Sequence, residues 1–199
     1  MELAFNEKIF PLKGILSDSM SDKEFYNFCQ QNELFHIERD ENKQIIIMPP
    51  TNANTGIKNA NLIGELIFWN RKRNKGICFD SSTGFTLQDG SVRSPDASWL
   101  TKEKWGQLNE TEKNEFPHIC PDFVIELKSK SDNLKLLESK MNKWIENGCQ
   151  LAWLINPENK TVFIYRKDGT ISKVAGFDSK LSGEEVLLGF ELDLSILND

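Results

Sequence analysis

Three residues of this chain have the types and spacing of a metal-assisted hydrolytic site: Asp96, Glu126 and Lys128. Asp96 follows a proline, and Glu126 and Lys128 stand two residues apart at the end of a short apolar run. Mg²⁺ takes oxygen ligands, usually one or two carboxylates together with water and substrate phosphate. A lysine ammonium ion beside such a site can hold phosphate oxygens or stabilise charge in the transition state. These residues therefore predict cleavage of phosphodiester bonds.

The apolar run at residues 123–127 predicts a buried strand that ends in opposite charges. Side chains alternate across a strand, so residues 122, 124, 126 and 128 share one face, and 123, 125 and 127 share the other. Burying a carboxylate and an ammonium ion costs several kcal/mol each unless the charges are compensated. A divalent metal ion and a phosphate would compensate both charges.

Asp96 opens another predicted strand, 96–100, and twenty-nine residues separate it from Glu126. If the two strands pair, their backbones lie about 4.8 Å apart, and both carboxylates can face one metal ion. The side chain of Leu127 points away, so its backbone carbonyl can also turn toward the metal. Asp122 also follows a proline, but it lies about 13 Å along the strand from Glu126, too far to share one ion easily. The alternative is a salt-bridged strand end, with Asp96 capping a turn.

The surrounding sequence predicts alternating helices and strands. Ser21-Asp22-Lys23-Glu24 has the form of a capping box and predicts a helix to about residue 32. Apolar residues at helical spacing predict a second helix over 57–71 and a third over 132–147, capped by Asp132. Short surface helices are expected in the polar segment 101–116. Strands are expected at 44–48, 77–79, 85–87, 96–100, 123–127, 151–155 and 161–166, with a hairpin turn at Asp89-Gly90.

This pattern predicts a single mixed α/β domain over residues 1–199. The core that carries the candidate hydrolytic site spans about 51–167, and an N-terminal helix and strand, 1–50, form an appendage. A chain of 199 residues fits one domain, and 39% hydrophobic with 27% charged residues is ordinary for a globular protein. No apolar run has transmembrane length, and the N-terminus does not resemble a signal peptide. We therefore expect a cytoplasmic protein with no membrane partner.

Cysteine and histidine content argues against several other chemistries. The four cysteines are widely spaced, with no C-x-x-C pair, and the chain has only two histidines. His118 and Cys120 form a lone H-x-C, a weak zinc signal, and buried structural thiols are the usual reading of such cysteines. A zinc site, a Cys-His nucleophile and a Ser-His-Asp triad are all disfavoured.

The net charge of −6 argues mildly against a general nucleic-acid coat protein, but it permits a local basic surface. Arg71, Lys72 and Arg73 form one basic cluster at a predicted helix end and are candidates for nucleic-acid contact. The alternative is a solvated helix end.

The chain also resembles the Uma family of restriction endonucleases, within the PD-(D/E)xK nuclease superfamily. The resemblance covers nearly the whole chain. It is carried by Met48-Pro49-Pro50-Thr51, Phe79-Asp80-Ser81-Ser82-Thr83-Gly84-Phe85, Arg93-Ser94-Pro95-Asp96, Pro121-Asp122-Phe123-Val124-Ile125-Glu126-Leu127, Lys140-Met141 and Trp153-Leu154-Ile155-Asn156.

The resemblance implies a restriction-endonuclease-like fold, with a mixed central β-sheet flanked by helices. It also implies that Asp96 and Glu126 bind metal, that Lys128 is the motif lysine, and that Lys140 faces the same site from the following helix. Relatives often carry a helix acid where this chain has Asn61, although Glu65 lies one turn further along.

Together these features predict a Mg²⁺-dependent DNA endonuclease, with Mn²⁺ as an alternative metal. A homodimer is expected, because cutting both strands of a duplex calls for two sites related by a two-fold axis. One rival hypothesis is a catalytically inactive nuclease-fold module with a binding or structural role. Another is a phosphodiesterase that acts on RNA or a small molecule.

Overall fold

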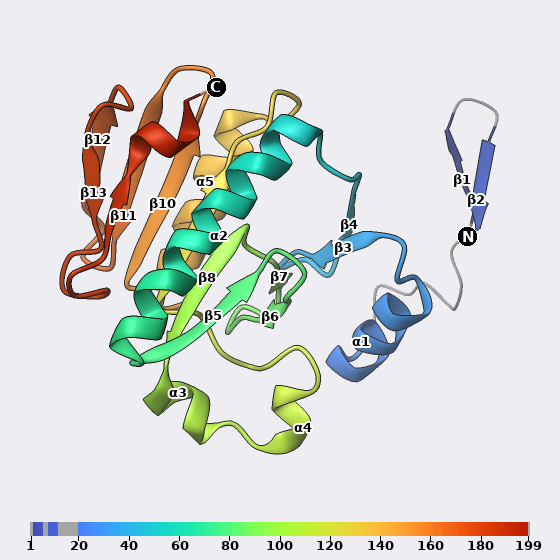
Figure 1. Cartoon of the computed structure of the whole chain (residues 1–199). Helices are drawn as coiled ribbons and strands as arrows, with labels where there is room; N and C mark the ends of the chain where they lie inside the picture. The colour runs from blue at the N-terminus through green and yellow to red at the C-terminus, as the bar shows by residue number, and fades with distance from the viewer. Residues whose placement is uncertain (1, 6–7, 12–19, 199) are drawn as a thin grey trace.

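A six-stranded sheet runs through the centre of the protein in the order β12-β11-β10-β9-β8-β5 (Figure 1). The computed structural model describes residues 2–5, 8–11 and 20–198. Strands β9 and β10 are parallel, and the other neighbouring pairs are antiparallel, so the sheet is mixed. Its strands are β5 (Gly76–Asp80), β8 (Ala97–Thr101), β9 (Phe123–Leu127), β10 (Leu151–Asn156), β11 (Thr161–Arg166) and β12 (Ile171–Ala175).

A second sheet of four antiparallel strands has the order β4-β3-β7-β6. The expected turn at Asp89-Gly90 joins β6 and β7, and Gly90 takes the positive φ of +80° that favours glycine there. Two hairpins complete the strands, β1 with β2 and β13 with β14. These strands are β1 (Glu2–Phe5), β2 (Lys8–Pro11), β3 (His36–Arg39), β4 (Ile45–Met48), β6 (Phe85–Thr86), β7 (Val92–Arg93), β13 (Lys180–Ser182) and β14 (Glu191–Asp193).

Helices α2 (Ala53–Arg73) and α5 (Leu134–Glu146) cover opposite faces of the large sheet (Figure 1). Phe123, Ile125 and Leu127 pack in the core that contains the apolar face of α2. Val124 packs with the side chains of α5. The alternation predicted for residues 123–127 is therefore confirmed, and Glu126 shares the α5 face with Val124.

Helix ends follow the local capping residues. The capping box of Ser21 and Glu24 is present at the start of α1 (Asp22–Gln31), as predicted. Helix α2 begins earlier than expected, because the Asn52 side chain accepts a hydrogen bond from the Thr55 amide. The N-cap of α5 is Asn133, not Asp132 as predicted. Asp132 instead accepts the Ser129 amide at 2.7 Å and closes the loop before the helix.

Short helices fill the remaining connections. The polar segment 101–116 contains two of them, as expected, and the 3₁₀ helix η1 lies near the C-terminal end. They are α3 (Lys102–Gln107), α4 (Glu110–Lys113) and η1 (Leu194–Leu197). Over residues 2–5, 8–11 and 20–198, we find no helix with the length and apolar character needed to cross a membrane.

Candidate active site

Asp96 directly precedes β8 and stands opposite Glu126 of the antiparallel neighbour β9. Ala97 pairs with Ile125, so the register continued by one residue places Asp96 across from Glu126. Residues opposed in this way have Cα atoms about 5 Å apart. The predicted pairing of the two strands is confirmed, and it is this pairing that brings the two acids together.

Both carboxylates are fixed by hydrogen bonds from more than one element. Asp96 accepts the side-chain amide of Asn59 on α2 at 2.9 Å and the backbone amide of Leu127 at 2.7 Å. Glu126, which is only 4% exposed, accepts the indole N–H of Trp144 on α5 at 2.9 Å. The acids are therefore held between the two helices that cover the sheet.

Lys140 of α5 is the cation in contact with Glu126. Its Nζ lies 2.9 Å from Glu126 Oε1 and 3.0 Å from Glu38 Oε1 on β3. Glu38 also accepts the Arg93 guanidinium at 3.2 Å and the Ser94 amide at 2.9 Å. One ammonium ion thus joins acids from two sheets. Lys140 lies where the resemblance implied, on the helix that faces the carboxylates.

The charges of this cluster are unevenly compensated. Burial, with help from the nearby carboxylates of Asp96 and Glu38, raises the pKa of Glu126 to about 7 against the opposing effect of Lys140. Burial likewise leaves the pKa of Asp96 above its usual value, despite the hydrogen bond from Leu127. Although burial also opposes ionisation of Glu38, Lys140 and Arg93 hold its pKa below the usual value. The excess negative charge therefore falls on Asp96 and Glu126.

Lys128 lies outside this network. Its ammonium ion donates to Glu158 at 2.7 Å and to the backbone carbonyl of Ser129 at 2.9 Å. Strand β9 ends at Leu127, so the alternation that places Glu126 no longer determines the direction of the next side chain. The lysine that approaches Glu126 is instead Lys140.

The other candidate residues lie along α2 and away from the acids. Glu65 is exposed beside Phe68 and Trp69. Arg71, Lys72 and Arg73 form the exposed last turn, and Arg71 lies about 18 Å along the helix axis from Asn59. Asn61, at the position of the family's helix acid, donates to the carbonyl of Ile196. The helix residue that contacts Asp96 is Asn59.

Sequence patterns did not reveal several members of the cluster. Glu38 comes from β3, which lies in the segment predicted to be an appendage. This strand has four residues, too few to show an alternation of charged and apolar side chains. Asn59 lies within the predicted helix 57–71, but no sequence pattern marked it as a partner of Asp96. Trp144 packs in the core, as an apolar position of a helix should, but its indole N–H also bonds Glu126.

The donors around the acids suit a hard cation. Asn59 Oδ1 and His36 Nε2 are buried without a hydrogen-bond partner, and Asn59 is the residue whose amide group bonds Asp96. The two carboxylates and the Asn59 oxygen are the kind of donor that Mg²⁺ prefers, and His36 is the one nitrogen among these candidate ligands. Among the described residues, no group of three or more His, Cys, Asp or Glu side chains is arranged to hold a metal. A cation here would depend on two acids and non-protein ligands, the usual mode for Mg²⁺.

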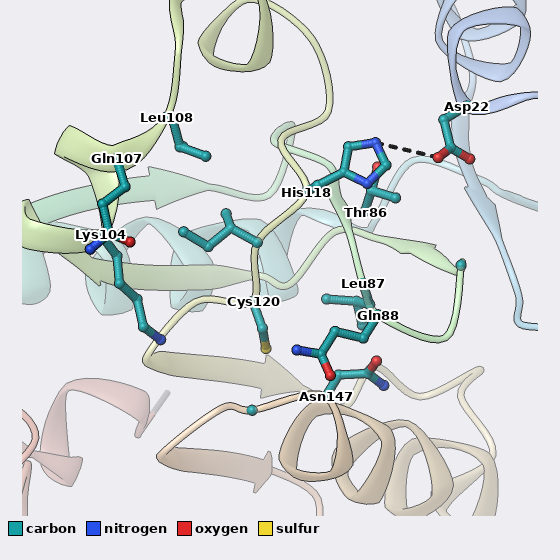
Figure 2. A pocket seen from close by; sticks show the side chains of 13 residues that line it. Asp22, Thr86, Leu87, Gln88, Lys104, Gln107, Leu108, His118, Cys120 and Asn147 are labelled. Carbon is teal, nitrogen blue, oxygen red and sulfur yellow. Dashed lines mark ion pairs between the residues drawn. The ribbon is translucent and has the colours of Figure 1, made fainter.

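A separate hollow of about 560 Å³ lies near the opposite end of β9 (Figure 2). His118 and Cys120 both line it, but His118 Nε2 pairs with Asp22 at 3.3 Å, and the Cys120 thiol donates to the Trp144 carbonyl. Figure 2 shows the Cys120 sulfur directed away from the His118 ring. The two residues do not form a joint ligand pair.

A mixed sheet with helices on both faces defines this protein as a member of the restriction-endonuclease-like α/β class. The chain belongs to the Uma2 family, described as "Putative restriction endonuclease", whose model matches residues 22–195. A similar solved structure is a "putative nuclease belonging to DUF820" from Anabaena variabilis. It has a TM-score of 0.68 and 21% identity, and the match covers 81% of this chain and 88% of that chain. This likeness concerns the fold alone. No curated protein matches the sequence.

Proposed function

We propose that this protein is a Mg²⁺-dependent DNA endonuclease that hydrolyses phosphodiester bonds at Asp96 and Glu126. The observation that carries the proposal is the opposed pair of half-buried Asp96 and buried Glu126, whose negative charge the neighbouring cations do not fully balance. A divalent cation would relieve this excess, and membership of a nuclease family supports DNA as the substrate. Mn²⁺ would suit the same oxygen donors.

Each residue of the cluster has a distinct role in this proposal. Asp96 and Glu126 would hold Mg²⁺, which when bound acidifies water and neutralises charge on the phosphate. Trp144 orients the Glu126 carboxylate through its 2.9 Å hydrogen bond. Lys140 favours the ionised form of Glu126 and presents a positive charge beside the acids, where it can stabilise negative charge on a phosphate.

The test is cleavage of duplex DNA, single-stranded DNA and RNA, each with Mg²⁺ and with EDTA. We expect Mg²⁺-dependent cleavage of DNA by the wild type and its loss in Asp96→Asn and Glu126→Gln. These two variants should also lose Mg²⁺ binding by calorimetry. Glu110→Gln is the matched control, because Glu110 is an exposed acid on α4 whose side chain pairs only with Lys113 among the residues described. DNA cleavage that survives in Glu126→Gln would refute the assignment.

An inactive binding or structural module is the second candidate. It is favoured by the position of Lys128, whose ammonium ion bonds Glu158 and leaves the motif without its lysine at Glu126. Such a module need not bind Mg²⁺ or Mn²⁺. Calorimetry that shows no binding of either ion by the wild type, together with no cleavage, would select this candidate over the enzyme.

A further inference from the structure

A hollow of about 670 Å³ lies beside the candidate active site, where the start of α2 meets the β10–β11 turn and the loop after β9. Four lysines from three separate segments line it, against a single acid, Glu158, among the described lining residues. We call this the cationic groove; its lysines are Lys58, Lys128, Lys130 and Lys160.

Two of the lysines in the cationic groove are close in sequence to residues of the candidate site. Lys58 lines the groove, and the next residue, Asn59, bonds Asp96. Lys128 follows Glu126 by two residues and is only 8% exposed, with its ammonium ion turned to the groove side at Glu158. The groove is therefore lined by residues that lie one or two positions along the chain from Asn59 and Glu126. A molecule bound in the groove would extend toward Asp96 and Glu126.

The electrostatics of the groove favour an anion. The hydrogen bond from Lys128 and the charges of Lys128 and Lys130 hold the pKa of Glu158 below its usual value. Thr55 of the first turn of α2 also lines the groove, so the positive end of a 21-residue helix adds to the lysines. The neutral side chains of Asn54, Ser129 and Asn198 add hydrogen-bond donors. Repeated phosphates match this combination of separate cations and polar donors.

We propose that the cationic groove binds the sugar–phosphate backbone of the DNA substrate and leads it to Asp96 and Glu126. The identification of DNA as a substrate rests on the proposed nuclease function, whereas binding of DNA in the groove does not require cleavage. The groove accounts for DNA contact by an acidic chain of net charge −6, because the positive charge is gathered at the site of reaction.

The basic end of α2 is the competing DNA contact. Arg71, Lys72 and Arg73 lie in the last turn, where Lys72 stacks over the Phe68 ring and Arg73 packs beside Gly189. They stand at the opposite end of the helix from Asn59 and the groove. A double substitution at each end of the same helix therefore separates the two surfaces with equal loss of charge.

The test measures binding of a fluorescent DNA duplex in EDTA at several salt concentrations, so that no cleavage occurs. Lys130→Gln/Lys160→Gln removes two exposed groove cations, and Arg71→Gln/Lys72→Gln is the matched control. We expect the groove variant to bind at least tenfold more weakly at low salt. The slope of log affinity against log salt should fall in magnitude by about 2, since each lost phosphate contact removes roughly 0.9. The control should bind like the wild type.

Glu158→Gln provides an independent arm with the opposite expectation. Glu158 competes with phosphate for Lys128, so its neutralisation should strengthen DNA binding severalfold. Normal binding by the groove variant, or unchanged or weaker binding by Glu158→Gln, would overturn the proposal, as would a groove that binds RNA but not DNA. Cleavage is measured separately: groove-dependent binding without Mg²⁺-dependent cleavage refutes the nuclease function and leaves the groove standing.

Discussion

Glu126 and Glu38 share one lysine, yet their pKa values move in opposite directions. Glu38 has Lys140, Arg93 and a backbone amide around it, which outweigh the effect of its burial. Glu126 has Lys140 and the Trp144 indole, but it also faces Asp96. The difference lies in the number of cations per acid, and it places the unbalanced charge at the pair of opposed acids.

This imbalance predicts a dependence of stability on pH in the metal-free protein. Burial raises the pKa of Glu126 from 4.5 to about 7 on folding, so its contribution to stability is full below pH 4.5 and is lost as the pH rises through 7. The expected loss is about 3 kcal/mol in the free energy of unfolding. Urea denaturation in EDTA across this range, compared with Glu126→Gln, measures it.

The comparison with Glu126→Gln is needed because His36 changes the free energy of unfolding with pH in the opposite direction. Burial lowers the pKa of His36 below 6.5, so its contribution rises as the pH increases toward that value. His36 is present in both proteins, and its effect cancels in the difference. If the wild type and Glu126→Gln show parallel pH profiles between 4.5 and 7, Glu126 does not have the raised pKa.

Lys128 and Lys140 should respond differently to the same substitution by methionine. Lys140→Met leaves the buried acids Glu38 and Glu126 without their shared cation, and should lower the free energy of unfolding by about 3 kcal/mol or more. Lys128→Met leaves only Glu158, whose side chain is 44% exposed, and should change stability by less than about 1 kcal/mol. Urea denaturation at pH 7 of both variants provides the measurement. Equal destabilisation would show that Lys128 contributes as much as Lys140 to the free energy of unfolding.

At the scale of elements, strand β3 joins the small sheet to the candidate active site. Its pairing with β7 at Arg39 and Val92 is brief, but Glu38 contacts both Arg93 and Lys140. The segment before residue 50 therefore contributes a side chain to the site, although it was expected to be an appendage.

This connection predicts that Glu38→Gln destabilises the protein by about 3 kcal/mol, because two partly buried cations lose a buried anion. Glu41→Gln is the matched control: Glu41 pairs with Arg93 and Lys143 but is about one-third exposed, so the loss should stay below about 1 kcal/mol. Thermal or urea unfolding tests both variants. A stable Glu38→Gln that no longer cleaves DNA would instead place Glu38 in the chemistry.

At the scale of the whole molecule, the candidate site contains one pair of opposed acids among the described residues of a single copy. Cleavage of both strands of a duplex requires two such pairs related by a two-fold axis. We propose a homodimer, and expect sedimentation at micromolar concentration to show a species of twice the 22.8 kDa chain mass. Plasmid DNA should then be linearised directly. A monomer that produces only nicked circles would contradict this assembly.

Local signals in the sequence were sufficient for much of the framework. The capping box of α1 and the alternation of residues 123–127 each follow from spacing within one short segment. These features depend on the period of a helix or a strand, which neighbouring residues determine.

The tertiary structure decided which charged side chains meet. Lys140, not Lys128, contacts Glu126, and Glu38 joins them from a strand about ninety residues away in the chain. The cationic groove likewise gathers lysines from α2, the loop after β9 and the β10–β11 turn. Such contacts depend on how distant segments pack, and long charged side chains choose among several partners within reach. The period of a single element therefore does not specify them.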